Sequence, residues 1–526
     1  MTGHIVVIGA GIGGLACAAR LAARGYDVSV FEKEPHVGGK ARRVSVGECE
    51  VDGGPTVFTM RDVFDGLFRE CGARLEDFVH LSRAEVLARH AWDDGARLDL
   101  FADPVRSEEA IADFAGADAA AGYRRFRGDT RRIHDILDKP MMRGANVSSP
   151  LPLLWRIGWW RLGDFAAMRP HQSMWSALGD YFPDPRLRQL FARYSTYCGS
   201  SPFEAPATLM LIAHVEQAGV WLIDGGIHAL ADAMRRLGEA RGVRFHTGTP
   251  VAEVLAESGR RVSGVRLADG SQVAADAVIC NADPGAIAGG QLGDEVARSV
   301  RPLPPAKRSL SAMVWYAHAA TDGPPLSHHN VFFSADYARE FEEIAAGRTP
   351  SSPSVYMCAQ DRPARLKPAA GETTLVGERE RIQIIVNAPA DGDTNTYSSE
   401  EKERCTAQMK ATLRRCGLEL EADAPLEVAS PVHWERLFPG TGGALYGRAS
   451  HGSAASFLRQ GPRTRMAGLY CAGGATHPSA GVPMAALSGL LAAKVLDADL
   501  ASTAKSNRAA MPGGMSMRSA RTGATP

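Results

Sequence analysis

The chain has 526 residues, more than one hydrophobic core usually supports, so we expect two or more domains. It carries 59 basic and 59 acidic residues, and 45% of its residues are hydrophobic, which is typical of a globular protein. This balance gives no reason to expect nucleic-acid binding. The 9 cysteines are scattered without C-x-x-C pairs, a pattern that predicts reduced thiols of a cytoplasmic protein and no metal site.

Contact with a membrane is expected to be peripheral. The first apolar strand begins within a few residues of Met1 and lacks a basic segment before it, so we expect no signal peptide. No uncharged apolar run approaches the roughly 18 residues that a membrane-spanning helix needs.

The N-terminal residues carry the strongest signal. An apolar strand at 4–8 leads into Gly9-x-Gly11-x-x-Gly14, and an amphipathic helical pattern follows. In a dinucleotide-binding turn the first glycine permits the tight turn, the second admits a pyrophosphate, and the third lets helix and strand pack closely. The phosphates then lie at the helix N-terminus, where free N–H groups favour negative charge.

A second strand, at 26–31, ends at Glu32, which lies 18 positions after Gly14 (32 − 14). A carboxylate at this distance accepts hydrogen bonds from ribose hydroxyls. Strand, helix and acid together therefore favour a nucleotide site over a glycine-rich surface turn. Two further glycine clusters, at 37–42 and 51–56, are interpreted as backbone close to the cofactor, the alternative being tight loops.

The order of strand and helix patterns predicts an α/β fold in which a discontinuous Rossmann-type domain (1–105, 215–285 and 460–500) is interrupted by two insertions with α+β elements. The first insertion, 106–214, is predicted to be helical, and the second, 286–459, is predicted to bind the substrate. Residues 501–526 lack periodicity and are predicted to form a disordered tail. The adjacent pair His328-His329 invites a metal interpretation, but without a carboxylate or cysteine at ligand spacing the start of a strand is favoured.

Three motifs together carry a resemblance to a known family. The first is the N-terminal glycine turn. The other two are Asp52-x-Gly54-Pro55-Thr56 and the segment Thr476-His477-Pro478-Ser479-Ala480-Gly481-Val482-Pro483. The chain resembles the bacterial-type carotenoid desaturases, relatives of phytoene desaturase in the flavin amine-oxidase-like superfamily, from residue 4 to about 500. The segments 194–202 and 219–226 are similar to that family too.

Within the family, the residues 57–60 after Gly-Pro-Thr and the segment 481–489 look most like the 1-hydroxycarotenoid 3,4-desaturase branch, also called hydroxyneurosporene or methoxyneurosporene desaturase. One departure is Ser479, where the family commonly has glycine. If that position required a positive φ, serine would be strained there.

The resemblance implies FAD as the cofactor and gives the matching positions roles. The glycine turn would hold the pyrophosphate and Glu32 the adenosine ribose. Lys40 stands where the family usually has arginine, so a phosphate contact would be a point charge, to which Arg42 could add. The remaining positions that the resemblance implies in cofactor binding are Gly39, Gly54, Pro55, Thr56, Val251 beside the adenine, Gly473 and Gly474 beside the ribityl chain, and Val482, Pro483 and Met484 at a helix start facing the flavin N1/O2 side.

The implied reaction removes two hydrogens from adjacent carbons of an acyclic carotenoid, most specifically at the C3–C4 bond of a 1-hydroxycarotenoid. A hydride would pass to flavin N5 and a proton would leave the neighbouring carbon. His477 is the candidate for a polar catalytic group near the isoalloxazine, and the alternative is a histidine that fixes its loop through backbone hydrogen bonds. Tyr197 and Glu204 are candidates for the substrate path, with structural roles favoured for both.

Other functions remain open at this point. The enzyme alternatives are a phytoene- or neurosporene-type desaturase and a carotenoid isomerase or saturase. The non-enzyme alternative is a lipid escort protein, which would share the architecture without catalysis. The intact glycine turn disfavours the escort protein. The electron acceptor implied is quinone or oxygen.

A carotenoid lies in a bilayer, so the enzyme is expected at the cytoplasmic surface of the inner membrane. The segment 151–162 combines Leu, Arg and Trp155, Trp159 and Trp160 as interfacial elements do, and the alternative is a core helix of the insertion.

Overall fold

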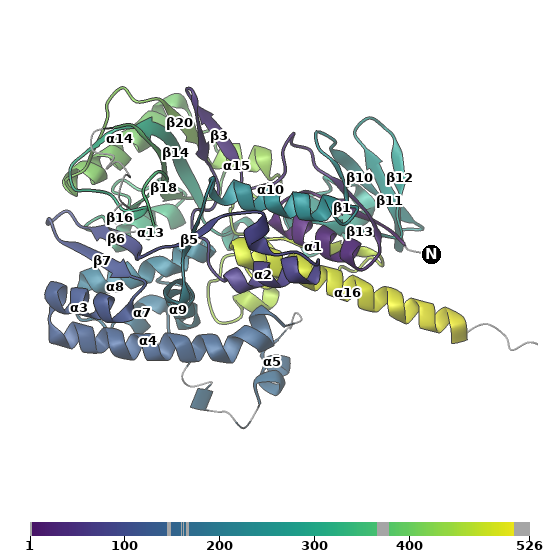
Figure 1. Cartoon of the computed structure of the whole chain (residues 1–526), viewed down its shortest axis with the longest axis horizontal. Helices are drawn as coiled ribbons and strands as arrows, with labels where there is room; N and C mark the ends of the chain where they lie inside the picture. The colour runs from purple at the N-terminus through teal and green to yellow at the C-terminus, as the bar shows by residue number, and fades with distance from the viewer. Residues whose placement is uncertain are drawn as a thin grey trace, which may run out of the picture.

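The computed structural model describes residues 3–144, 149–158, 160, 163–164, 168–364 and 378–509. The molecule has three parts: a parallel sheet with its helices, a large mixed sheet, and a layer of helices beneath that sheet (Figure 1).

The parallel sheet is assembled from distant parts of the chain. Its strand order is β21-β13-β1-β2-β9, and each neighbouring pair is parallel. These strands are Leu469–Cys471, Ala277–Cys280, His4–Ile8, Asp27–Phe31 and Arg244–His246. Strands buried on both faces are expected to be continuously apolar, as are β13 and the buried residues 5–8 of β1. The prediction of a discontinuous Rossmann-type sheet agrees with this topology.

Helices and a small sheet cover the two faces of the parallel sheet. Helix α1 (Ile12–Ala23) packs against α10 (Gly226–Glu239) and α16 (Val482–Ala509). The antiparallel sheet β10-β11-β12 (Val251–Glu257, Arg261–Leu267 and Gln272–Ala274) packs over the other face, and β11 and β12 are joined by a turn at Asp269-Gly270.

The mixed sheet has the order β20-β14-β18-β17-β16-β6-β7. Its strands are Leu426–Ala429, Ser311–Ala319, Glu380–Ala388, Val355–Ala359, His329–Phe332, Val86–Ala91 and Arg97–Phe101. The hairpin β6–β7 belongs to this sheet because β6 pairs in parallel with β16, although the boundary expected at residue 105 assigns both strands to the nucleotide domain. The sequence does not reveal this pairing, because β6 and β16 are far apart along the chain.

The helical layer occupies the segment where the sequence predicts helices. It comprises α3 (Pro104–Ala115), α4 (Ala117–Leu137), α5 (Pro150–Ile157), α7 (Met174–Leu178), α8 (Pro185–Ala192) and α9 (Leu211–Ala218). Asp103 and Asp184 cap α3 and α8, and each precedes a proline at the first helical position, an arrangement that fixes both starts.

The prediction of a disordered tail from residue 501 is wrong at its start, because α16 continues through residues 501–509. The rest of the predicted tail, 510–526, lies outside the described residues. Within the described part of the chain, no helix combines the length and apolarity needed to cross a bilayer. The remaining elements are α2 (Arg61–Glu70), α11 (Pro284–Ala288), α12 (Asp294–Ala297), α13 (Tyr337–Ala345), α14 (Ser399–Arg415), α15 (Pro431–Leu437), β3 (Arg43–Val46), β4 (Cys49–Asp52), β5 (Leu81–Arg83), β8 (Trp221–Ile223), β15 (Thr321–Asp322) and β19 (Glu419–Leu420), with short helical turns at Leu75–Asp77, Asp138–Met142, Arg193–Cys198, Ala207–Met210, Pro305–Lys307 and Ala455–Leu458.

Candidate flavin and substrate site

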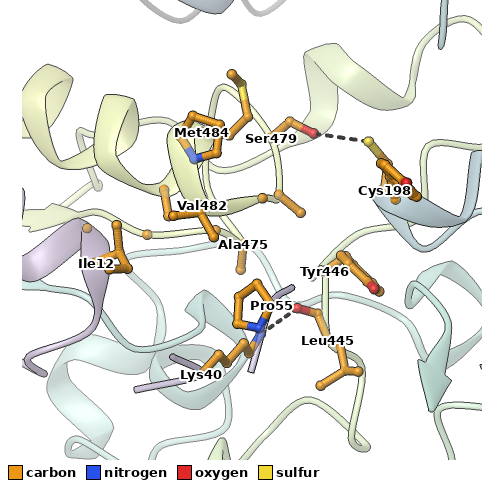
Figure 2. Close-up of a pocket in the computed structure, with 18 of the residues that line it drawn as sticks. Ile12, Lys40, Pro55, Cys198, Leu445, Tyr446, Ala475, Ser479, Val482 and Met484 are labelled. Carbon is orange, nitrogen blue, oxygen red and sulfur yellow. Dashed lines mark hydrogen bonds between the residues drawn. The ribbon is translucent and has the colours of Figure 1, made fainter. Parts of the chain in front are cut away.

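One cavity of about 980 Å³ runs between the parallel sheet, the mixed sheet and the helical layer. This volume lies at the upper end of the range for small-molecule sites. Of the residues that the sequence places in a cofactor site, all but Gly14 line it: Gly9, Gly11, Glu32, Gly39, Lys40, Arg42, Gly54, Pro55, Thr56, Val251, Gly473, Gly474, Val482, Pro483 and Met484. Segments more than 400 residues apart thus meet at one cavity wall (Figure 2).

The glycine turn has no room for side chains. A Cβ atom on Gly14 would lie 2.1 Å from the Gly9 carbonyl oxygen, so this third glycine serves the packing of helix on strand that the motif predicts. A Cβ on Gly11 would lie 2.9 Å from Asn281 Nδ2. Asn281 donates through Nδ2 to the Gly9 carbonyl, while its buried Oδ1 has no hydrogen-bond partner among the described residues. A bare backbone with a free buried acceptor beside it fits a bound dinucleotide.

Glu32 lies at the end of β2, buried at the cavity edge. Its Oε2 accepts from the Ala10 N–H at 2.7 Å, and its Oε1 accepts from the Glu34 N–H at 3.0 Å. Each carboxylate oxygen retains a further lone pair, so the side chain is held in place and can still accept from ribose hydroxyls.

Lys40 is a partly buried cation of the cavity wall. Its Nζ donates to the Leu445 carbonyl oxygen and lies 5.1 Å from the centre of the Phe438 ring. Burial lowers the pKa of Lys40 to about 8, and the nearby Asp283 carboxylate acts in the opposite direction. Arg42 also lines the cavity, with Nη2 3.5 Å from Glu34 Oε2.

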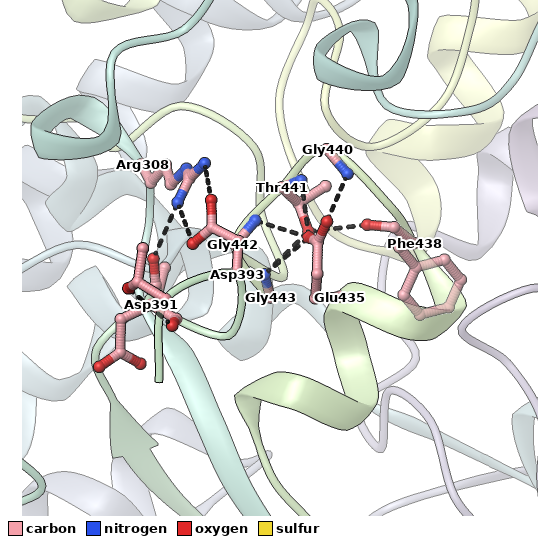
Figure 3. A network of polar contacts seen from close by, with 11 residues as sticks. Arg308, Asp391, Asp393, Glu435, Phe438, Gly440, Thr441, Gly442 and Gly443 are labelled. Atoms are coloured by element: carbon pink, nitrogen blue, oxygen red, sulfur yellow. Dashed lines mark hydrogen bonds and ion pairs between the residues drawn. The ribbon is translucent and has the colours of Figure 1, made fainter. Parts of the chain in front are cut away.

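The loop that carries Leu445 is held by a single carboxylate. Glu435, at the end of α15, accepts N–H groups of Gly440, Thr441, Gly442 and Gly443 at 2.7 to 3.3 Å (Figure 3). Arg308 closes the other side of the loop, where it pairs bidentately with Asp393. No local sequence pattern predicts a role for this loop, because its glycine N–H groups meet Glu435 only in the folded chain.

The first turn of α16 faces the cavity from the C-terminal side. Val482, Pro483 and Met484 line it, so the helix dipole favours negative charge there. Ser479, in the preceding loop, is not among the non-glycine residues with positive φ, so the strain that its departure from glycine suggested does not arise. Its hydroxyl lies 3.9 Å from Cys198 Sγ (Figure 2).

His477 does not line the cavity, although Pro478 and Ser479 do. Its ring is 1% exposed, and Nε2 donates to the Gly144 carbonyl at 3.1 Å. Burial lowers the pKa of His477, so the neutral imidazole is favoured. This geometry favours the alternative in which the histidine fixes its loop. Glu204 is also outside the cavity wall and pairs with His451 at 2.5 Å, whereas Tyr197 lines it.

Strand pairing places a cysteine beside His328 and His329. Cys358 of β17 pairs with His329 of β16, and its Sγ lies 3.4 Å from His328 Nε2, so a cysteine stands close although sequence spacing shows none. Burial raises the pKa of the Cys358 thiol and lowers that of His328 to about 4. The thiol therefore stays protonated and acts as a hydrogen-bonding partner of a neutral imidazole.

Away from the glycine turn the cavity wall is mostly apolar. Its lining there comes from the helical layer and from the mixed sheet: Leu137, Met141, Leu153, Leu154, Met168, Ile212, Val215, Val331 and Phe333. Helix α5 presents Leu153 inward, whereas Trp155 is 74% exposed and Trp160, just after the helix, is 69% exposed. Trp159, Arg161 and Leu162 of the same predicted interfacial segment lie outside the described residues.

The chain is similar to known flavin-dependent proteins. Residues 12–496 match the family of flavin containing amine oxidoreductases. A hydroxyneurosporene desaturase of Rubrivivax gelatinosus is 47% identical over 99% of this chain and 98% of its own, and a zeta-carotene-forming phytoene desaturase of Myxococcus xanthus is 31% identical over 93% and 92%. Among solved structures, an oxidoreductase of Methanosarcina mazei has a TM-score of 0.58 at 18% identity, covering 94% of this chain and 100% of its own, a likeness of fold.

The predictions of an FAD cofactor, a Rossmann-type flavin fold and a desaturase are confirmed by these relationships together with the sheet topology. The chain belongs to the flavin-containing amine oxidoreductases and, within them, to the carotenoid desaturases.

Proposed function

We propose that the protein desaturates the C3–C4 bond of a 1-hydroxylated acyclic carotenoid. One observation carries the proposal: the same cavity that the dinucleotide-binding residues line extends between mostly apolar side chains of the helical layer. A relative 47% identical over nearly the whole chain is named hydroxyneurosporene desaturase, which favours the hydroxylated substrate over phytoene.

FAD, when bound, supplies the oxidant that takes up the two electrons and the hydrogen lost from carbon. The protein's own part is positioning. Lys40 and the first turn of α16 place positive charge beside the cofactor, and apolar residues such as Leu153, Ile212 and Phe333 keep water from the polyene. Loss of the hydride leaves positive charge that the adjacent polyene delocalises, and this charge acidifies the C–H bond of the neighbouring carbon, whose electron pair becomes the new double bond. No dedicated base is therefore assigned.

We further propose that the substrate is taken from a bilayer through α5, which would place the protein at the cytoplasmic face of the inner membrane. The inward Leu153 and Leu154 and the outward Trp155 support this, since an amphipathic helix with interfacial tryptophan binds lipid surfaces. The electron acceptor proposed is a membrane quinone or oxygen.

The test is incubation of the FAD-loaded protein with liposomes that contain either a 1-hydroxylated acyclic carotenoid or its non-hydroxylated counterpart. We expect anaerobic bleaching of the flavin and a product with one more conjugated double bond, hence a red-shifted spectrum, from the hydroxylated pigment. Conversion of phytoene or neurosporene alone would establish the other regiochemistry. An altered geometry without added unsaturation would indicate an isomerase, loss of a double bond a saturase, and binding without bleaching an escort protein.

A further inference from the structure

A buried cluster of polar side chains interrupts the apolar half of the cavity. Arg193 and Tyr197 lie in the helical turn Arg193–Cys198, and Glu216 lies in α9; all three line the cavity. We call these three residues the polar cluster. Arg193 is 5% exposed and Glu216 is 2% exposed, so both charges are buried.

The polar cluster is linked by hydrogen bonds. Arg193 Nη1 donates to the Tyr197 hydroxyl at 2.9 Å, and that hydroxyl donates to Glu216 Oε1 at 2.8 Å. Behind the cluster, Tyr194 donates to Glu216 Oε2 but does not line the cavity. Burial raises the pKa of Tyr197, so its hydroxyl keeps its proton.

The cluster is incompletely paired as it stands. Arg193 Nε and Nη2 have no hydrogen-bond partner among the described residues, and Nη2 lies 3.9 Å from Glu216 Oε1, too far for a hydrogen bond. A buried ion pair stabilises a fold only when its remaining donors are satisfied, and replacing it by apolar residues is often neutral or stabilising. An ion pair with unsatisfied hydrogen-bond donors, in the wall of a cavity for a hydrocarbon, therefore points to a polar group of the ligand as the missing partner.

The polar cluster stands at the junction between the two halves of the cavity. Cys198, next to Tyr197, contacts Ser479 in the loop before α16. On the mixed sheet, the Thr56 hydroxyl lies 2.6 Å from the Tyr356 hydroxyl, and both residues line the cavity. Tyr356 and Tyr197 thus line the same cavity. The cluster thus lies beside residues of the cofactor half.

We infer that Arg193, Tyr197 and Glu216 form the subsite for the tertiary hydroxyl group at the end of the substrate. This inference rests on the proposed function and goes further by naming the residues that select the hydroxylated pigment. C1, which bears the hydroxyl, is separated from the C3–C4 bond by C2 alone, so the group that binds the hydroxyl has to lie next to the cofactor, on the side where this cluster lies. The alcohol accepts a hydrogen bond from Arg193 and donates one to the Glu216 carboxylate, pairings that a purely hydrocarbon end cannot make.

Selectivity follows from these unpaired groups. A site built to hydrogen-bond a hydroxyl disfavours the analogue that lacks it, because burying the analogue leaves the site's charges without a partner. The wild-type holoenzyme should therefore prefer the hydroxylated carotenoid over its non-hydroxylated counterpart by at least about 10-fold in kcat/KM.

The experiment compares three variants of the holoenzyme on both pigments in liposomes. Tyr197→Phe and Arg193→Lys change the polar cluster, and Tyr194→Phe is the matched control, since it removes a hydroxyl that contacts the same carboxylate from outside the cavity. FAD content and Tm report folding. Substrate dissociation constants are measured by tryptophan quenching with the pre-reduced holoenzyme, which does not turn over.

We expect Tyr197→Phe and Arg193→Lys to reduce the preference for the hydroxylated pigment about 10-fold, through weaker binding of that pigment, and Tyr194→Phe to keep it. The inference is overturned if the preference is unchanged in both cluster variants, if both pigments lose activity equally, or if the wild type shows no preference. A wild type that desaturates neither pigment refutes the proposed function itself, which separates the two failures.

Discussion

The ammonium group of Lys40 donates a hydrogen bond to the carbonyl oxygen of Leu445, so the second glycine cluster of the nucleotide domain is tied to a loop some 400 residues later. The Phe438 ring from the same loop lies over Nζ. The only acidic group with a resolved influence on the pKa of Lys40 is Asp283. Lys40 is thus a partly buried cation held mainly by neutral partners, an arrangement that leaves its charge available to an anionic cofactor.

The affinity for FAD should depend on this charge. Because the pKa of Lys40 is lowered from 10.5 to about 8, the ammonium prevails in the apoprotein below pH 8 and is lost above it. The cofactor's phosphates favour the protonated form, so by linkage the dissociation constant for FAD should rise with pH above about 8, by up to about 10-fold per pH unit.

Titration of the apoprotein with FAD at pH 7 to 9.5 checks this prediction. We expect Lys40→Met to bind FAD more weakly, with a dissociation constant that does not change with pH. The exposed Lys494 provides the control variant Lys494→Met; an unchanged slope in Lys40→Met would contradict the assignment.

The stability of the apoprotein should show the opposite trend. A lysine whose pKa is lowered in the folded state weakens folding while it is charged, and this penalty is relieved as pH rises from about 8 toward the ordinary value of 10.5. In this window wild-type apoprotein should gain stability relative to Lys40→Met, as measured by urea unfolding at pH 7.5 and 9.5. Equal pH dependence of the two proteins would show that Lys40 is not a buried cation.

Gly14 should be irreplaceable, in contrast with a helical glycine nearby. The Cβ atom of Gly14→Ala would lie 2.1 Å from the Gly9 carbonyl oxygen, a clash with backbone that forces β1 and α1 apart. We expect a loss of bound FAD and a cost of about 3 kcal/mol or more in unfolding free energy. Gly66, in α2, has open space around the corresponding position, so Gly66→Ala should stabilise by about 0.5–1 kcal/mol. A Gly14→Ala variant that retains yellow colour and wild-type Tm would refute this account of the turn.

Much of the nucleotide half was predictable because its signals are local. The turn at Gly9, the acid at Glu32 and the helix start at Val482 each depend on a few adjacent residues, and the structure places them along one cavity wall. Backbone geometry near a phosphate restricts residue type strongly, so sequence alone carries that information.

The remaining features depend on contacts between distant segments. The hairpin 86–101 joins the mixed sheet through pairing with residues more than 200 positions away, and Cys358 reaches His328 only through strand register. Glu435 gains its role from the fold of the loop that follows it. Arg193 and Glu216 look like ordinary surface charges of helices in the sequence, and only their burial reveals a subsite.

Glu435 should act as the support of the Leu445 loop. Its Oε2 accepts three backbone N–H groups, and a glutamine can offer only one carbonyl oxygen without charge. Because charge-assisted hydrogen bonds are about twice as strong as neutral ones, Glu435→Gln should lower the unfolding free energy by about 1–3 kcal/mol and weaken FAD binding. Glu427→Gln, on an exposed position of β20, is the control. Thermal unfolding with and without FAD provides the measurement, and a wild-type Tm in Glu435→Gln would exclude this supporting role.

His477 should behave as a positioning residue. A glutamine can donate its amide N–H to the Gly144 carbonyl in place of Nε2, so His477→Gln should keep activity within about 10-fold of wild type and leave the pH–rate profile unchanged. His477→Ala should lower the Tm, since it removes a buried ring and the hydrogen bond of that ring to the Gly144 carbonyl. A general acid or base would instead show a loss of about 100-fold or more in His477→Gln and a lost pH inflection, and that result would restore the catalytic interpretation.

The two exposed tryptophans of the α5 region provide the test of membrane binding. Trp155 and Trp160 are 74% and 69% exposed, and burying such rings in a bilayer interface contributes binding without any role in the core. The double variant Trp155→Ala/Trp160→Ala should therefore reduce sedimentation with liposomes about 10-fold or more, while FAD content and Tm stay unchanged. Val105→Ala is the matched control, because Val105 is 60% exposed at the start of α3, on another helix. Parallel loss of FAD and Tm would instead identify the segment as part of the core, and the delivery of substrate through α5 would then be refuted.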